Sequence, residues 1–398
     1  MDLNLYTKGG APRFPDTLIT TIAEGKKDMP FRVDVLNLPF HSPWKNQFRL
    51  SGIDFLADKD KGIICSTDGD VWLVQGFLSS TGKLIWKRIA AGLFQPLGVR
   101  VVKDEIFITC RDQLVKLHDL NGDGEIDLFQ SFNSDHQVTN HFHEFAMGLQ
   151  TDTEGNFYYA KSARHARRAL VPQHGTLMKV SKDGLKTEII ATGFRAANGV
   201  CINPDGSFIV TDQEGNWNPM NRINWVTKGG FYGNMFSYNP PPDSSDEGMI
   251  PPIVWVEKHI DQSPSELLWV NSNKWGPLTG SLLNFSYGYG KVFIVPFEKI
   301  GTVRQGGVFE LPMPRFQTGI MRGRFNDGDG QLYVCGLSAW GSSQSNLGGL
   351  YRIRYNGQKA IIPIGLKARQ NGIEINFSHG LEVNDADKTS SYKIKTWD

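Results

Sequence analysis

GIDFLADKDKGIICST (residues 52–67) opens with glycine and an apolar residue, forms a strand-like run, turns through charged residues and ends in a second strand-like run. Similar phrases follow in GVRVVKDEIFITC (98–110), GLQTDTEGNFYYA (148–160) and GVCINPDGSFIVTD (199–212). Successive copies begin 46, 50 and 51 residues apart. Repeats of this length indicate a β-propeller, because each blade is a small sheet that buries its faces only against neighbouring blades.

Two later copies bring the set to six. They are SLLNFSYGYGKVFIVP (281–296) and GRFNDGDGQLYVCG (323–336). The longer interval before the first of them contains NPPPDSSDEG (239–248), a Pro-rich segment that is typical of a loop. We therefore predict an all-β, six-bladed β-propeller over residues 49–360.

Both ends of the chain depart from the repeat. Residues 1–48 are rich in Pro and Gly, and we expect them to close the first or the last blade or to wrap over the propeller. After residue 361 the pattern changes, and GIEINFSHGLEVNDADKTSSYKIKTWD (372–398) has the alternation of opening β-sandwich strands. Residues 361–398 are thus predicted to be the start of a β-sandwich.

Composition narrows the classes of partner. Lys and Arg total 42 against 41 acidic residues, so no general attraction to nucleic acid or to an anionic membrane is expected. No segment approaches the roughly 20 apolar residues of a membrane span. The cysteines form no CxxC pair and are expected to be buried thiols without a redox or metal role; they are Cys65, Cys110, Cys201 and Cys335.

Two segments carry a resemblance to a known family. GFRAANGVCINPDGSFIVTDQEGNWNPMNRINWVTKGGFYGN (193–234) resembles the equivalent stretch of soluble PQQ-dependent aldose and sorbosone dehydrogenases. MRGRFNDGDGQLYVCG (321–336) resembles that family's segment with two arginines separated by one residue. The resemblance implies a fold like that of soluble quinoprotein glucose dehydrogenase, PQQ as the cofactor, and oxidation of a sugar or polyol.

A closer resemblance is to the propeller modules of bacterial proteins described as membrane-bound dehydrogenases, which commonly carry a c-type haem domain. The phrases that carry it are LVKLHDLNGDGEIDLF (114–129), HEFAMGLQTDTEGNFYYA (143–160) and GLSAWGSSQSNLGGLYRIRY (336–355). It implies that electrons pass to a haem domain or a cytochrome, and that the protein is periplasmic or secreted.

The family match suggests which residues would hold the cofactor. A carboxylated quinone requires fixed cations, and the planar fork of Arg grips a carboxylate with two bonds. Arg195, Arg322 and Arg324 match the family's arginines and are predicted to converge on one ligand at the propeller axis. Asn198, Trp217 and Trp340 complete the predicted cofactor-binding set.

The match also has departures. Ala196 follows Arg195 where the family has Asn, and Asn221 and Arg222 replace the acidic pair expected before Ile223. No lysine occupies the position that assists the quinone, where this chain has tyrosines.

Sugar oxidation requires a base for the hydroxyl proton, and a histidine is suited to that role. The segment NHFHEFAMGLQ (140–150) places His141 and His143 shortly before an inner strand, where the family's base lies. We predict that His143 or His141 is the catalytic base. Glu144 is an alternative base, or a group that orients one imidazole.

The segment DLNGDGEIDLF (119–129) has the spacing of a calcium loop. Alternating side-chain oxygens around a glycine can turn inward on Ca²⁺, but Gln130 stands where a bidentate Glu closes an EF-hand. We predict a structural Ca²⁺ held by Asp119, Asn121, Asp123, Glu125 and Asp127.

Two other functions remain open. AANGVCINPDGSFIVTD (196–212) also resembles six-bladed lactonases, in which Asn198 and Asp212 would hold a divalent ion that activates water. A carbohydrate-binding propeller without catalysis is the third hypothesis. The chain lacks a GxSxG elbow, a Walker loop and a dinucleotide fingerprint, so these classes of enzyme are set aside.

Overall fold

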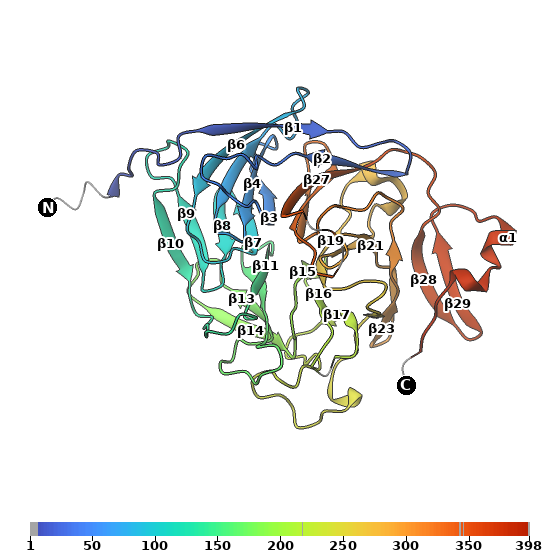
Figure 1. Cartoon of the computed structure of the whole chain (residues 1–398). Coiled ribbons are helices and arrows are strands. Elements are labelled where there is room, and N and C mark those ends of the chain that lie inside the picture. Colours follow the sequence, from blue (N-terminus) through green and yellow to red (C-terminus); the bar gives the residue numbers. More distant parts are fainter. Residues whose placement is uncertain (1–6, 217, 342–343, 345, 397–398) are drawn as a thin grey trace.

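The structure is a computed structural model, and it describes residues 7–216, 218–341, 344 and 346–396. The described residues form four four-stranded antiparallel sheets and one nine-stranded sheet that contains two blades, arranged around a common axis (Figure 1). The predicted all-β six-bladed propeller is confirmed. We call the face on which the inner strands begin the upper face. The inner strands of blades 1 to 6 are β3 (Leu50–Phe55), β7 (Gly98–Val102), β11 (Ala146–Thr151), β15 (Val200–Ile202), β19 (Pro264–Trp269) and β25 (Arg322–Asn326).

Each blade continues outward through antiparallel neighbours in chain order. These outer strands are β4 (Lys61–Ser66), β5 (Val71–Gln75) and β6 (Lys83–Ala90) in blade 1; β8 (Glu105–Thr109), β9 (Leu114–His118) and β10 (Leu128–Asn133) in blade 2; β12 (Phe157–Lys161), β13 (Thr176–Val180) and β14 (Thr187–Thr192) in blade 3; β16 (Phe208–Asp212), β17 (Asn221–Val226) and β18 (Val254–Val256) in blade 4; β20 (Leu282–Ser286), β21 (Val292–Ile294) and β24 (Phe309–Glu310) in blade 5; and β26 (Gln331–Leu337) and β27 (Gly348–Tyr355) in blade 6.

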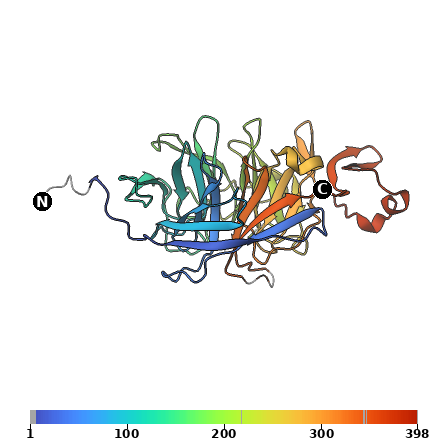
Figure 2. The same ribbon diagram turned by 90° about the horizontal axis from the view of Figure 1, so that it is seen from above.

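The N-terminal strands close the ring. β2 (Phe31–Leu36) pairs with β27 as the fourth strand of blade 6, and β1 (Thr17–Ala23) pairs with β6 of blade 1. Figure 2 shows these two strands running along the edge of the disc. The fully buried Asp34 on β2 forms ion pairs with Arg352 (2.8 Å) and Arg354 (2.7 Å) on β27. The closure therefore combines backbone pairing with a buried charge cluster.

The glycines that open the repeated phrase are explained by the contact between blades. A Cβ on Gly98 would lie 2.6 Å from the carbonyl carbon of Gly148, and one on Gly199 would lie 2.0 Å from the carbonyl oxygen of Ser265. Inner strands of neighbouring blades thus approach backbone to backbone, and only glycine fits there.

Buried apolar side chains fill the spaces between blades. Trp72 and Trp86 are fully buried between blades 1 and 6, where Tyr333 and Cys335 join the same cluster. All four cysteines are free and buried, and burial raises the pKa of Cys65 to about 11. These features agree with the expectation of inert thiols.

Smaller elements lie at the periphery of the propeller. They are the hairpin β22 (Phe297–Ile300)–β23 (Val303–Gly306), the 3₁₀ helices η2 (Asp246–Gly248) and η3 (Asn273–Leu278), the hairpin β28 (Pro363–Arg369)–β29 (Gly372–Phe377), α1 (Val383–Ala386) and η4 (Thr389–Ser391). The β28–β29 hairpin lies outside the ring, and the β-sandwich predicted there stays a prediction. Within the described ranges, no helix is long and apolar enough to cross a membrane.

Candidate functional site at the upper mouth of the propeller

His143 lies on the segment that leads into β11, on the upper face. Its Nδ1 is 2.7 Å from the carbonyl oxygen of Ala163, and since a carbonyl only accepts, Nδ1 carries the proton and Nε2 carries a lone pair. Burial, with the Arg195 charge as a smaller cause, lowers the pKa of His143 to about 4. The imidazole is therefore neutral at pH 7, with one nitrogen able to accept a proton.

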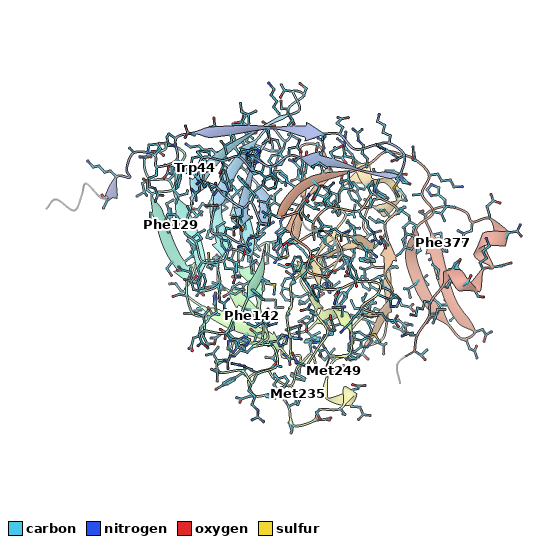
Figure 3. The ribbon with its side chains drawn as sticks, viewed as in Figure 1. Trp44, Phe129, Phe142, Met235, Met249 and Phe377 are labelled. Carbon is cyan, nitrogen blue, oxygen red and sulfur yellow. The ribbon has the colours of Figure 1, made fainter. Side chains whose placement is uncertain are left out.

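Hydrogen bonds from blades 2 and 3 hold this segment in place. The Arg111 guanidinium donates to the carbonyl oxygens of Phe142 (3.0 Å) and His141. The fully buried Lys161 donates through Nζ to the carbonyls of Glu144 (3.1 Å) and Arg111 (3.0 Å). Phe142 is labelled in Figure 3, beside blade 3. The backbone on both sides of His143 is thus fixed by the side chains of Arg111 and Lys161, which the sequence did not single out.

The structure separates the three candidate bases. The Glu144 carboxylate is fully buried, accepts from Thr139 N (2.6 Å), and contacts Arg164 (3.4 Å) and His174 (3.3 Å). It orients neither His141 nor His143 through its side chain in any described contact. His141 stacks on Phe142, with ring centroids 4.9 Å apart. His143 has the best geometry for a base.

Arg195 lies beside His143 on the loop that enters blade 4. Its carbonyl accepts from Ala163 N (2.9 Å), so the two residues share Ala163 as a neighbour. The guanidinium donates to Gln213 Oε1 (2.7 Å) and Asn216 Oδ1 (3.0 Å), which are both neutral acceptors. Arg195 is therefore a cation at the mouth whose side-chain hydrogen bonds go to neutral amides.

A chain of hydrogen bonds extends from Arg195 to Trp340. Gln213 Nε2 donates to Ser263 Oγ, and Trp340 Nε1 donates to the same hydroxyl oxygen at 2.8 Å. Trp340 is 52% exposed, so its ring is accessible at the mouth. Blades 4, 5 and 6 thus contribute to one network. Trp217, the other predicted aromatic, lies outside the described residues.

An apolar layer lies in the channel at this level. Leu97, Met147 and Met321, which precede or begin inner strands of three blades, form a buried cluster. Phe145, Tyr287 and Leu337 pack against it, and Phe145 also contacts the His143 ring, with centroids 5.5 Å apart. The layer is therefore apolar and contacts His143 through Phe145.

Arg322 lies within the channel, 1% exposed. Its Nε donates to the carbonyl of Leu97 (3.1 Å), and its Nη1 donates to Asn198 Oδ1 (2.9 Å) and to the carbonyl of Met321 (2.7 Å). Arg322 and Asn198, which were each predicted to bind the cofactor, are therefore hydrogen-bonded to each other. Arg322 bonds the backbone carbonyls of Leu97 and Met321, and Asn198 holds Arg322, so both residues support the apolar layer.

Arg324 points toward the lower face. It pairs with Glu266 (2.8 Å) and is 3.9 Å from Asp54. It lines a cavity of about 380 Å³ at the ends of the inner strands, together with Arg100 and Gln150. Among the described residues, the guanidinium groups of Arg195, Arg322 and Arg324 have no hydrogen-bond or ion-pair partner in common. The three arginines lie at different depths along the channel.

The residues proposed for a lactonase metal are engaged with protein cations. Asp212 is fully buried, accepts from the backbone N of Arg195 (2.9 Å) and Ala196 (2.7 Å), and pairs with Arg222 (2.6 Å). Asn198 Oδ1 accepts from Arg322. The departure that places Arg222 where the family has an acid is thereby explained, since Arg222 neutralises Asp212.

The oxygens of the Asp119–Asp127 loop bind the chain itself. Asp119 accepts from Gly122 N and Gly124 N (both 2.7 Å), and Asp127 accepts from Gly10 N (2.8 Å) and Leu120 N (2.9 Å). The remaining predicted ligands also hold local groups: Asn121 donates to Gly10 O, Asp123 accepts from Glu125 N, and Glu125 pairs with Arg13. Among the described residues, no group of three or more His, Cys, Asp or Glu is arranged to hold a metal ion.

Comparison with known proteins places the fold. No family model and no curated protein matches the chain. Among solved structures, it is similar to the soluble aldose sugar dehydrogenase of Escherichia coli in the apo-form (16% identity, TM-score 0.57, 86% of this chain and 100% of that chain). It is also similar to the PQQ domain of pyranose dehydrogenase from Coprinopsis cinerea in the holo form (12%, 0.61, 87% and 98%) and to the PQQ-bound aldose sugar dehydrogenase of Streptomyces coelicolor (10%, 0.53, 85% and 98%). The chain has the propeller fold of these dehydrogenases. At such identities the likeness concerns the fold.

Proposed function

We propose that this protein is a quinoprotein-type oxidoreductase that acts on a sugar or polyol at the upper mouth of the propeller. The observation that carries the proposal is the neutral His143, whose Nδ1 is fixed by Ala163 and whose Nε2 carries a lone pair beside Arg195. Oxidation of an alcohol to a carbonyl removes the hydroxyl proton, and Nε2 is the acceptor for that proton.

The groups at the mouth fit a planar, carboxylated cofactor such as PQQ. Arg195, with only neutral side-chain partners, would hold a carboxylate, and Trp340 would stack on the ring system. PQQ supplies a two-electron acceptor when bound. Asn198 and Arg322 support the apolar layer on which such a group would rest, whereas Arg324 belongs to the lower end of the channel.

Transfer of electrons to a c-type haem domain or cytochrome, and a periplasmic or secreted location, belong to the same proposal. They rest on the resemblance of the blade phrases at residues 114–129, 143–160 and 336–355.

The test is a fluorescence titration with PQQ, followed by dye reduction in the presence of aldoses and polyols. We expect His143→Gln to bind PQQ as the wild type does and to lose about 100-fold or more in turnover, because a general base contributes about 10²–10⁴. Arg195→Lys should weaken PQQ binding, because Lys keeps the charge and loses the fork. His118→Gln is the matched control, since His118 bonds only Gln130 among described residues, on the outer strands of blade 2.

The result that would refute the proposal is a wild-type protein that neither binds PQQ nor reduces the dye. If that protein still bound sugars, a non-catalytic carbohydrate-binding propeller would be the function.

A further inference from the structure

The loop between β12 and β13 is strongly basic. Residues 161–168 read KSARHARR, and no Asp or Glu occurs between Glu154 and Asp183. The whole chain has a net charge of only +1, so the concentration of positive charge in this loop is a local feature.

This loop borders the proposed active site. The Ala163 carbonyl accepts from His143, and the ring of His165 has its centroid 5.2 Å from that of His143. His165, Arg167 and Arg168 are exposed. The same loop therefore accepts the hydrogen bond that orients the base and presents cations to solvent beside the mouth.

Glu144 neutralises one cation of this loop, the buried Arg164, whereas the exposed Arg167 and Arg168 are not paired with a described acid. Glu144 is paired with Arg164 and His174, which are both buried. Asp212 is likewise paired with Arg222, and Glu214 is 3.6 Å from Lys258.

The arginines at the rim keep their charge available. Arg167 and Arg168 form no ion pair with a described residue, and the guanidinium groups of Arg111 and Arg195 donate to neutral acceptors. Burial lowers the pKa of His141, and the charges of Arg164 and Arg167 lower it further, as expected in a positive potential. Anions are therefore attracted to this side of the mouth.

Apolar surface accompanies the charge. Phe142 is 66% exposed, and Leu170 is 60% exposed at the end of the basic loop. The Phe142 centroid is 6.3 Å from that of His165. An exposed aromatic ring next to arginines is suited to a sugar ring that carries a carboxylate, because the ring stacks on the apolar face while the fork binds the anion.

We propose that the substrate is an acidic oligosaccharide, of the uronic acid class, whose carboxylates are bound by Arg167 and Arg168 while one sugar unit lies at His143. Two features favour an oligomer over a single sugar: the cations are at the exposed rim, and His143 is 6% exposed within the mouth. The proposal rests on the proposed function for the identity of the reacting centre, but the binding that it predicts does not require the quinone.

The experiment is calorimetric titration of the full chain, without PQQ, using a galacturonic acid trimer and a neutral hexose trimer. We expect the acidic trimer to bind at least about tenfold more tightly, since charge-assisted bonds to Arg are about twice as strong as neutral ones. The double variant Arg167→Ser/Arg168→Ser should lose this preference. The control variant Lys26→Ser/Lys27→Ser removes the same charge from exposed residues between β1 and β2, and it should keep the preference for the acidic trimer.

Equal binding of the two trimers, or a preference that survives the double arginine change, would overturn the proposal. A short single-stranded DNA is the probe for charge alone, and binding as tight as that of the acidic trimer would also overturn it, since a general polyanion site would then suffice. PQQ binding and oxidation of neutral sugars by the same protein are measured separately, so failure here leaves the proposed function standing. Failure of PQQ binding alone leaves the arginine-dependent saccharide site standing.

Discussion

Asp212 forms a buried ion pair with Arg222 and accepts a hydrogen bond from the backbone of Arg195. Its replacement by Asn tests whether this buried ion pair stabilises the fold and the loop that carries Arg195. The carboxylate and the Arg222 guanidinium are both fully buried, with 2.6 Å between Nη2 and Oδ2. The only other acceptor for Arg222 among described residues is the carbonyl of Gly193, at 3.2 Å, and its Nε and Nη1 have no partner there. Asp212→Asn keeps the size of the side chain and leaves a buried cation without its counter-charge.

Loss of one partner from a buried pair costs about 3–5 kcal/mol, because the remaining charge stays desolvated. We expect Asp212→Asn to lower the free energy of unfolding by that amount in urea denaturation. Glu188→Gln is the control, because Glu188 pairs with Lys228 at the surface, where substitutions usually change stability by less than about 0.5 kcal/mol. If the two variants lose the same small amount, the buried pair does not stabilise the loop that carries Arg195.

Three further outcomes are expected. Arg111→Met removes the donors to the carbonyls of His141 and Phe142, which hold the segment that carries His143. Turnover should therefore fall about tenfold or more, and wild-type turnover would refute the role of Arg111 in positioning His143. Burial lowers the pKa of Lys161 from 10.5 to about 7, so the unfolded chain binds more protons between these values, and stability should rise with pH from about 7 to 10 by up to about 1.4 kcal/mol per unit. Lys161→Met should lack this component in urea denaturation at pH 7 and 9, and identical pH slopes would contradict it. For the 119–127 loop, whose oxygens accept from the chain's own N–H groups, Ca²⁺ should shift the melting temperatures of the wild type and of Asp123→Ala equally; a rise in the wild type alone would mean that the loop binds Ca²⁺.

The inner strands of five blades could be predicted from the sequence because each blade repeats a local pattern. The copy at 281–296 was wrong by one strand, because it forms β20 and β21, and the inner strand of blade 5 is β19. Gly98 and Gly199 mark points at which adjacent blades approach backbone to backbone, so that a side chain would not fit there. The position of His143 could also be predicted from the sequence, since a histidine just before an inner strand must lie near the upper end of the channel. Its role as a base stays a prediction.

The strand pairing that closes the ring could not be predicted from local sequence patterns. β2 pairs with β27, and Val33 is the partner of Ile353. Pairing between residues so distant in sequence depends on where the last blade places its unpaired edge strand in space. Local sequence patterns do not determine that position.

For Arg322 and Arg324, the sequence predicted the position on a strand but not the partners. Their residue type and strand placement came from the sequence, and Arg322 and Arg324 indeed occupy alternate positions on β25. Their partners come from other blades: Asn198 and Leu97 for Arg322, Glu266 and Asp54 for Arg324.

The sequence by itself thus determined the blades, the buried thiols and the candidate base, because strand periodicity and glycine spacing act over short distances. Only the tertiary structure decided which charges are neutralised inside the channel and which, such as Arg195 and Arg167, stay available at the mouth. The reason is physical, since a buried charge takes its partner from whichever blade lies opposite, and that neighbour is set by the closed ring.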